Sequence, residues 1–416
     1  MKDPAPRHRS SPAATSQPWW RDAIIYHILV DRFRRGGKSP LTGDPTQPEF
    51  CGGNLQGVTE SLRYLRRLGV NTLWLSPIQC TAGYHGYHVT DFEDVEPRFG
   101  GMPAFLELLR AAKPDFRILL DWVPNHVHRT HPFFLDAQRS PRSRYRDWFF
   151  FNRRGGYRCF LDVTELPKLN LDHPEARRYI IQCALKWLDL GADGFRLDHV
   201  LGPSLDFWRE FQIAIKQRHP TAFLMGEALF TGVGPAHLVT LELPHKRRHL
   251  QNAKRGHSVA ADVMREYVGV FDGILDFEFQ GLMKRHVAHA RKPLSAPAIQ
   301  RKLDKHYLSF PSETCLPSFL DNHDMDRFLF EARDNKARLR QAAEIQFRQT
   351  QPPIIYYGTE AGMSQSKPLQ GPYGDLVARQ MMPWKNPDRA MFEFYQKLIR
   401  TRKQRQRAMA KNTADE

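Results

Sequence analysis

Short apolar runs alternate with amphipathic helical stretches along most of this 416-residue chain. Eight runs rich in β-branched and aromatic side chains begin at residues 23, 70, 117, 192, 223, 271, 316 and 352. Apolar stripes at helical spacing fill several of the intervals, for example residues 58–69, 174–191 and 206–219. This alternation predicts α/β architecture with a parallel sheet, and eight strands are the number that closes a (β/α)8 TIM barrel.

Two intervals are longer than one strand–helix unit requires. About 75 residues separate the starts of the third and fourth runs, whereas one unit needs roughly 30. We therefore expect residues 128–172, which are rich in aromatic residues and Arg, to form a small lid domain inserted after the third strand. The barrel would then comprise residues 19–127 and 173–405. A second excursion, residues 228–270, follows the fifth run.

The two ends of the chain are polar. Residues 1–18 are rich in Pro and Ser and lack the apolar core of a secretory signal, so we expect a flexible tail there. Residues 406–416 are expected to form a basic C-terminal tail. No run reaches the roughly 20 apolar residues that span a bilayer, and the five cysteines are irregularly spaced without a C-x-x-C pair. These features predict a cytoplasmic protein with free thiols and no membrane partner.

The excess positive charge, formally +16, is spread along the chain and is densest in residues 245–257 and 397–411. Neither segment interleaves aromatic side chains as a nucleic-acid stacking surface would. We interpret both as solvated faces and expect no nucleic-acid partner. For residues 241–260, a role in shaping an acceptor site or in binding a partner also stays open.

Polar residues stand where four of the apolar runs end, and in barrels these ends build the active site. The third, fourth, fifth and seventh runs end in DWVPNH (Asp121, Asn125, His126), GFRLDH (Arg196, Asp198, His199), Glu227 and FLDNHD (Asn322, His323, Asp324). Carboxylates therefore converge from neighbouring strands onto one mouth. His199 directly follows Asp198, so strand alternation predicts that it points to the opposite face.

Paired carboxyl groups at a barrel mouth are suited to cleaving glycosidic bonds. Asp198 precedes Glu227 by 29 residues, about one strand–helix unit, so the two are expected on adjacent strands, near enough for retention of configuration. Arg196 points to the same side as Asp198 and would keep it ionised. Glu227 under an aromatic-rich lid would have the raised pKa of a general acid.

Several further motifs occur in a recognisable order. They are GVNTLWLSP at 69, YHGYHVTDFEDVEPRFGG at 84, LPKLN at 166 and IIYYGTEAGM at 354. Together with the four strand ends, they resemble the α-amylase family of glycoside hydrolases (glycoside hydrolase family 13) from about residue 19 to about 403. LPKLN is similar to the neopullulanase and cyclomaltodextrinase branch.

The resemblance implies a retaining hydrolase that cleaves α-glucosidic, mainly α-1,4, bonds in maltodextrins or related α-glucans. It implies that Asp198 is the nucleophile, Glu227 the general acid/base and Asp324 the carboxylate that stabilises the transition state. The substrate-binding residues that we expect in addition are Tyr87, His126, His323, Arg196, Asp121, Asn125 and His85, the last being equally compatible with a scaffold role.

The sequence departs from the family pattern in two places. Many members bind calcium with the Asn of the third-strand motif and an Asp in the segment that reads LPKLN here, but Lys168 cannot ligate calcium. We therefore expect no cofactor and no metal site, and the substitution argues against a structural calcium. Members usually continue into a C-terminal β-sandwich domain, which we expect to be absent.

Two alternative functions stay open. An α-glucan transglycosylase shares the covalent intermediate and differs in whether water or a sugar accepts it. A non-catalytic sugar-binding or scaffold protein on the same barrel is the other, because a fold does not dictate a function. The presence of all three carboxylates together with Arg196 favours an enzyme. The oligomeric state is not predicted.

Overall fold

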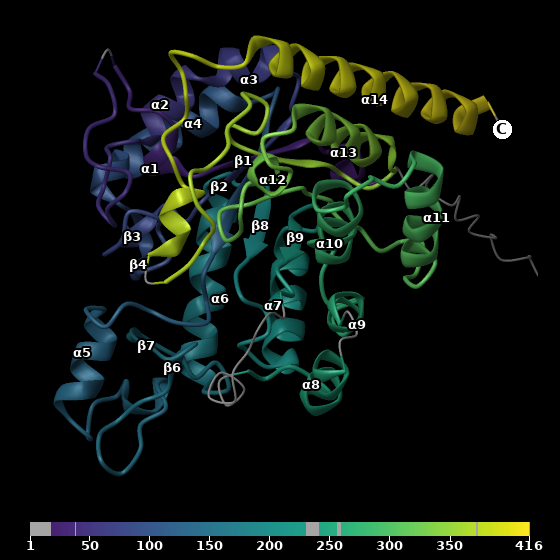
Figure 1. Ribbon diagram of the computed structural model, residues 1–416. Helices are drawn as coiled ribbons and strands as arrows, with labels where there is room; N and C mark the ends of the chain where they lie inside the picture. Colours follow the sequence, from purple (N-terminus) through teal and green to yellow (C-terminus); the bar gives the residue numbers. More distant parts are fainter. Residues whose placement is uncertain (1–17, 38, 230–240, 256–258, 372, 416) are drawn as a thin grey trace, which may run out of the picture.

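A parallel sheet forms the centre of the computed structural model, which describes residues 18–37, 39–229, 241–255, 259–371 and 373–415 (Figure 1). Its seven strands are ordered β10-β9-β8-β5-β2-β1-β11. The strands are β1 (Ile25–Ile28), β2 (Thr72–Leu75), β5 (Arg117–Trp122), β8 (Gly194–Leu197), β9 (Phe223–Gly226), β10 (Gly273–Ile274) and β11 (Ile354–Tyr356). Each lies within a predicted apolar run.

The seventh predicted run joins the two edges of this sheet. Cys315 forms a parallel bridge with Gly273 of β10, and Ser318 forms one with Pro353 beside β11. Pro317 lies between them and has no N–H to donate, so the run forms single bridges in place of a continuous strand. The eight runs therefore close into the predicted barrel.

Helices pack around the sheet. They are α1 (Val30–Phe33), α2 (Leu55–Glu60), α3 (Leu62–Leu68), α4 (Gly101–Ala112), α6 (Pro174–Asp189), α7 (Leu205–Arg218), α10 (Phe277–Met283), α11 (Ala296–Tyr307), α12 (Phe328–Glu331), α13 (Lys336–Arg348) and α14 (Arg389–Asp415). Helix α7 illustrates why they form. The Ser204 side chain accepts a hydrogen bond from the N–H of Phe207, and Phe207, Phe211 and Ile215 bury one face at helical spacing.

Alternate residues of each strand face two apolar clusters. In β1, Ile25 belongs to a cluster inside the barrel with Trp74, Leu119 and Phe223. Its neighbour Tyr26 packs in the larger cluster between sheet and helices. The interior is thus a packed core rather than a pore, and it supports the polar residues that follow the strands.

The chain leaves the barrel between β5 and α6. This excursion contains α5 (Pro132–Arg139), β6 (Cys159–Phe160) and β7 (Val163–Pro167), and it extends away from the sheet at the lower left of Figure 1. Strands β6 and β7 pair antiparallel. Leu161 and Asp162, which connect them, both have positive φ, 43° and 65°. A hairpin turn of two left-handed residues suits Asn or Gly better than Leu.

A small antiparallel pair, β3 (Gln79–Thr81) and β4 (Val89–Val95), follows β2. The second predicted excursion contains α8 (Lys246–Lys254) and α9 (Ala260–Arg265), and its residues 230–240 and 256–258 lie outside the described residues. All five cysteines are described and none is disulfide-bonded. Among the described helices, none combines the length and apolar character needed to cross a bilayer.

The structure describes only one of the two predicted tails. Residues 1–17 of the predicted N-terminal tail lie outside the described residues. The predicted basic C-terminal tail, residues 406–416, falls in the last part of α14, which continues to Asp415. Residues 397–411 are almost entirely Lys, Arg, Gln, Ala, Met and Leu, which favour helix, and they contain neither Gly nor Pro.

Candidate active site

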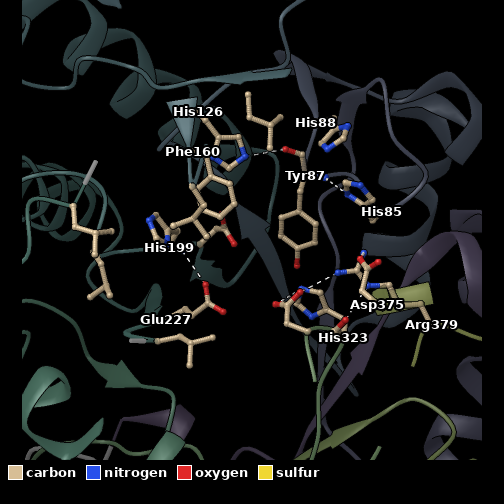
Figure 2. Close-up of a pocket in the computed structure, with 17 residues that line it drawn as sticks. His85, Tyr87, His88, His126, Phe160, His199, Glu227, His323, Asp375 and Arg379 are labelled. Atoms are coloured by element: carbon tan, nitrogen blue, oxygen red, sulfur yellow. Dashed lines mark hydrogen bonds and ion pairs between the residues drawn. The ribbon is translucent and has the colours of Figure 1, made fainter. Parts of the chain in front are cut away.

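A pocket of about 380 Å³ lies where the strands end at their carboxyl edge (Figure 2). Seven predicted site residues line it: His85, Tyr87, His126, Asp198, Glu227, His323 and Asp324. Asp198 directly follows β8 and Glu227 directly follows β9. Figure 2 shows Glu227 and His199 on one side of the opening and His85, Asp375 and Arg379 on the other.

Arg196 is the hub beneath the pocket. Its fully buried guanidinium places Nη1 2.8 Å from Oδ1 of Asp121 and 2.6 Å from Oδ1 of Asp198. Its Nη2 lies 2.5 Å from Oε1 of Glu227. Asp198 and Glu227 therefore share one guanidinium. The sequence led us to expect Arg196 to act on Asp198. In the structure it contacts both Asp198 and Glu227.

The protonation of Asp198 and Glu227 follows from this arrangement. Burial raises the pKa of Glu227, and the Arg196 guanidinium only partly opposes the shift. Burial likewise raises the pKa of Asp198, again against Arg196, and the neighbouring Glu227 carboxylate adds to the rise. Because one cation faces three carboxylates, the two groups titrate as a pair that retains a proton more readily than free carboxyl groups.

Glu227 is fixed through both of its carboxylate oxygens. Oε1 pairs with Arg196, and Oε2 accepts a 3.0 Å hydrogen bond from the N–H of His199. His199 has φ 44°, a left-handed conformation that is rare for a non-glycine residue. This turn interrupts strand alternation, so the prediction that His199 faces away is wrong, and its side chain lines the pocket.

Asp324 lies on the opposite side, held by a histidine and an arginine. Nε2 of His323 lies 3.0 Å from its Oδ2, and Nη2 of Arg379 donates to its Oδ1 at 2.9 Å. Desolvation in the pocket opposes ionisation of Asp324, but His323 and Arg379 outweigh it and hold the pKa of that carboxyl well below its usual range. Asp324 is therefore a carboxylate across the physiological pH range.

Tyr87 and three histidines complete the polar wall. The Tyr87 hydroxyl donates to Oδ2 of Asp121 at 2.8 Å, and its ring is parallel to that of His323 at 5.0 Å between centroids. Nε2 of His126 lies 3.2 Å from the Tyr87 carbonyl, and Nδ1 of His85 accepts from the Tyr87 N–H at 3.1 Å. Burial lowers the pKa of His126 to about 3. This imidazole is therefore neutral near pH 7.

Comparison with known sequences identifies the family. The profile described as "Alpha amylase, catalytic domain" matches residues 27–156 and 255–386, more than half of the chain. The chain belongs to the α-amylase family. Alpha-amylase 2 of Dictyoglomus thermophilum is 34% identical over 391 residues, and neopullulanase 2 of Thermoactinomyces vulgaris is 31% identical over 418 residues. These alignments cover 92% and 95% of this chain but only 64% and 65% of those two proteins.

A solved structure has the same architecture. The ligand-free cyclic α-maltosyl-(1→6)-maltose hydrolase of Arthrobacter globiformis superposes with a TM-score of 0.77 at 25% identity, covering 92% of this chain and 83% of that chain. The barrel fold and the family that the motifs indicated are thus confirmed.

Three residues predicted to contact substrate lie behind the pocket. Asp121, Asn125 and Arg196 are at most 1% exposed and do not line the opening. Asp121 accepts from Trp74, Tyr87 and Arg196, and Nδ2 of Asn125 lies 3.2 Å from Nδ1 of His126. Asp121 and Arg196 lie within β5 and β8, and Asn125 follows β5, so all three lie beneath the residues that line the opening.

The sequence prediction missed several residues that line the opening. The polar ones are His88, Asp375 and Arg379, and the apolar ones are Phe160, Leu161, Leu166, Leu201, Leu229 and Leu241. Arg379 comes from an irregular loop after β11 that has no periodic pattern. The aromatic content of residues 128–172 was the signal that pointed to Phe160. Leu241 shows that the second excursion also reaches the pocket.

The residues that hold calcium in many members of the α-amylase family do not fit that ion here. The buried Lys168 ammonium donates to the carbonyl of Gly202 at 2.8 Å and lies 3.9 Å from Oε1 of Glu242. Asn125 approaches the same Gly202 residue. A cation would meet a fixed positive charge there in place of the carboxylate that calcium prefers.

Proposed function

We propose that this protein is a retaining glycoside hydrolase that cleaves α-glucosidic, mainly α-1,4, bonds in maltodextrins or related α-glucans. The observation that carries the proposal is the pair Asp198 and Glu227, held on one guanidinium at the base of a pocket with Asp324 opposite. Relatives named as an α-amylase and a neopullulanase support the same chemistry.

In the first step, Glu227 gives its proton to the glycosidic oxygen while Asp198 attacks the anomeric carbon. Burial favours the protonated form of Glu227 that this step requires. Asp198 is hydrogen-bonded to Arg196 at 2.6 Å, and we assign it the ionised state that a nucleophile requires. In the second step, Glu227 removes a proton from water, which releases the sugar from Asp198 with its original configuration.

The remaining polar residues serve the reacting sugar. Ionised Asp324 accepts hydrogen bonds from sugar hydroxyls and balances the positive charge that develops at the anomeric centre. The Tyr87 ring offers a flat face to the sugar. His85, His126 and His323 supply polar groups that orient its hydroxyls. Asp121 and Arg196 act beneath them as positioning residues.

We assign residues 128–172 the role of a lid over the acceptor side of the pocket. Phe160, Leu161 and Leu166, on the β6–β7 hairpin, line the opening. The hairpin supplies an apolar wall that lowers the local dielectric around Glu227, which is consistent with the raised pKa of its carboxyl. We further propose that the Lys168–Gly202 contact ties this segment to the barrel and that no calcium is required.

The test is cleavage of maltoheptaose by the purified protein, with the products separated by length. Wild-type protein is expected to release shorter maltodextrins, and Asp198→Asn and Asp324→Asn to lose activity by about 10³-fold or more. Arg301→Met, an exposed residue of α11, is the matched control. No cleavage of maltoheptaose, a cyclodextrin, pullulan or isomaltose would contradict the proposal, whereas products longer than the substrate would identify transfer to sugar.

A further inference from the structure

A second cavity, of about 800 Å³, lies on the inserted segment outside the catalytic pocket. Its lining includes Arg146, Arg153 and Arg158 together with aromatic rings and the amides of Asn152 and Asn170. Asp147 is the acidic residue of this lining. The proposed glycosidase reaction does not use any of these residues.

Positive charge around this cavity is not neutralised by neighbouring carboxylates. Residues 139–158 contain seven Arg and one Asp. Every one of those Arg side chains is described, and in the described part of the chain none forms an ion pair with an Asp or Glu. By contrast, Arg129 and Arg177, which flank this stretch, both pair with acidic side chains. Three of these seven arginines, Arg146, Arg153 and Arg158, line the cavity.

Two of the three guanidinium groups lie over aromatic rings. The guanidinium carbon of Arg146 lies 3.5 Å from the ring centroid of Phe151, and that of Arg158 lies 4.8 Å from the centroid of Phe150. Stacking fixes the orientation of a guanidinium and leaves its N–H edge available. Arg146 uses one nitrogen on the Ala137 carbonyl. The other edges are preorganised donors for an anion with several oxygens.

Neighbouring parts of one short segment line the two cavities. Arg158 lines the second cavity, and Phe160, two residues later, lines the catalytic opening. The ring centroid of Phe150, in the wall of the second cavity, lies 5.7 Å from Nζ of Lys168, which donates to the Gly202 carbonyl in the loop after β8. A glucan chain long enough to reach both linings would carry a substituent from the first to the second.

We propose that this cavity binds a phosphate monoester carried by the α-glucan substrate. The inference rests on the proposed function, since it adds a charged substituent to that substrate class. A phosphate ester matches the fork-like donors of Arg146, Arg153 and Arg158, and the two Asn amides are suited to the hydroxyls of its sugar. Guanidinium groups lie over two of the aromatic rings in the lining, whereas a nucleic acid would need an extended basic groove with free aromatic faces.

Binding to the Asp198→Asn protein tests the proposal without depending on turnover. Titration calorimetry compares a phosphorylated maltodextrin with the same preparation after phosphatase treatment. We expect the phosphorylated form to bind about tenfold more tightly, as two or three charge-assisted hydrogen bonds predict, and the preference to shrink with added salt. Arg153→Gln with Arg158→Gln is expected to abolish the preference. Arg142→Gln, an exposed arginine outside the cavity, is expected to keep it.

Other outcomes either overturn the proposal or separate it from the proposed function. Equal binding of both maltodextrins, or a preference that survives in the double variant, would show that the cavity does not read phosphate. Inorganic phosphate or a single-stranded oligonucleotide that binds as tightly as the phosphorylated glucan, and is lost in the double variant, would assign a free anion or a nucleic acid instead. If neutral maltoheptaose is not cleaved but the phosphate preference is present, the proposed function fails while this site stands.

Discussion

The main-chain N–H of His199 donates a 3.0 Å hydrogen bond to Oε2 of Glu227. His199 is the residue after Asp198, so this bond couples the positions of the two carboxyl groups through the backbone. The left-handed φ of 44° at His199 is what turns the N–H toward Glu227. With Arg196 on the other carboxylate oxygen, Glu227 has little freedom to move before substrate arrives.

Glu227→Gln is expected to make the protein more stable at higher pH, at the expense of activity. Burial raises the pKa of Glu227 in the folded state, so below the ordinary pKa both states are protonated and wild type has no disadvantage. As pH rises, the Glu227 carboxyl ionises more readily in the unfolded chain than in the folded protein. The free energy of unfolding of wild type therefore falls until the pH exceeds the pKa of Glu227 in the folded state. The difference in Tm between variant and wild type should therefore widen as pH rises above the ordinary pKa of a glutamate, about 4.3. A constant difference would contradict the raised pKa.

Arg379→Met is expected to lower kcat/KM by about 10²-fold, because Asp324 loses a ligand that fixes and ionises it. Desolvation then raises the pKa of Asp324, so the acidic limb of the kcat/KM profile should move to higher pH. Arg301→Met is the control. An unchanged acidic limb with reduced kcat/KM would mean that Arg379 acts only through packing.

The contrast between Arg379 and the strand-end residues shows what sequence can predict. Asp198 and Glu227 directly follow regular apolar strands, so their convergence follows from barrel geometry. Arg379 lies in a loop without periodic pattern, and its contact with Asp324 spans 55 residues of chain. Only the folded loop brings the two together. Similarly, the apolar character of the run that contains Pro317 predicted a strand. Because Pro317 has no N–H to donate, this part of the chain forms only single bridges.

The difference in stability between wild type and Lys168→Met is expected to depend on pH, because the Lys168 ammonium is buried. Burial lowers the pKa of Lys168 from 10.5 to about 8. Between those values the unfolded chain holds a proton that the folded protein has already released, so stability rises with pH in wild type and not in the variant. The stability difference should shift in favour of wild type by on the order of 3 kcal/mol over this window, as measured by chemical denaturation.

The same account predicts that EDTA leaves the Tm and the activity of wild-type protein unchanged. A constant stability difference between wild type and Lys168→Met from pH 8 to pH 10.5 would contradict the buried ammonium. If EDTA lowers the Tm and added calcium restores it, the proposal that the Lys168 ammonium takes the place of a metal ion would be contradicted.

Leu161→Asn is expected to stabilise the fold and weaken substrate binding at once. Leu161 has φ 43° in the β6–β7 turn, a conformation that costs a non-glycine residue about 1 kcal/mol and that Asn adopts more readily. Its side chain lines the catalytic pocket, so loss of the apolar contact should raise KM by about tenfold. Urea denaturation and steady-state kinetics measure the two effects. Lower stability with unchanged KM would show that Leu161 serves only the hairpin.

The position of substrate-facing residues was harder to predict than their identity. Asp121 and Arg196 share a strand-end pattern with Asp198, yet they lie beneath it because they occupy the strands rather than follow them. His199 departs from strand alternation because of one backbone angle that no residue pattern encodes. Side-chain depth and positive φ values depend on tertiary packing, which is why the sequence did not specify them.

The most direct test of the central claim is the configuration of the newly released reducing end. NMR during early hydrolysis of maltoheptaose follows the anomeric protons before mutarotation, with Asp198→Asn as the inactive control. The shared contact of Asp198 and Glu227 with Arg196 predicts that the α-anomer appears first, as a covalent intermediate on Asp198 requires. Initial release of the β-anomer would contradict that mechanism and with it the roles given to both carboxyl groups.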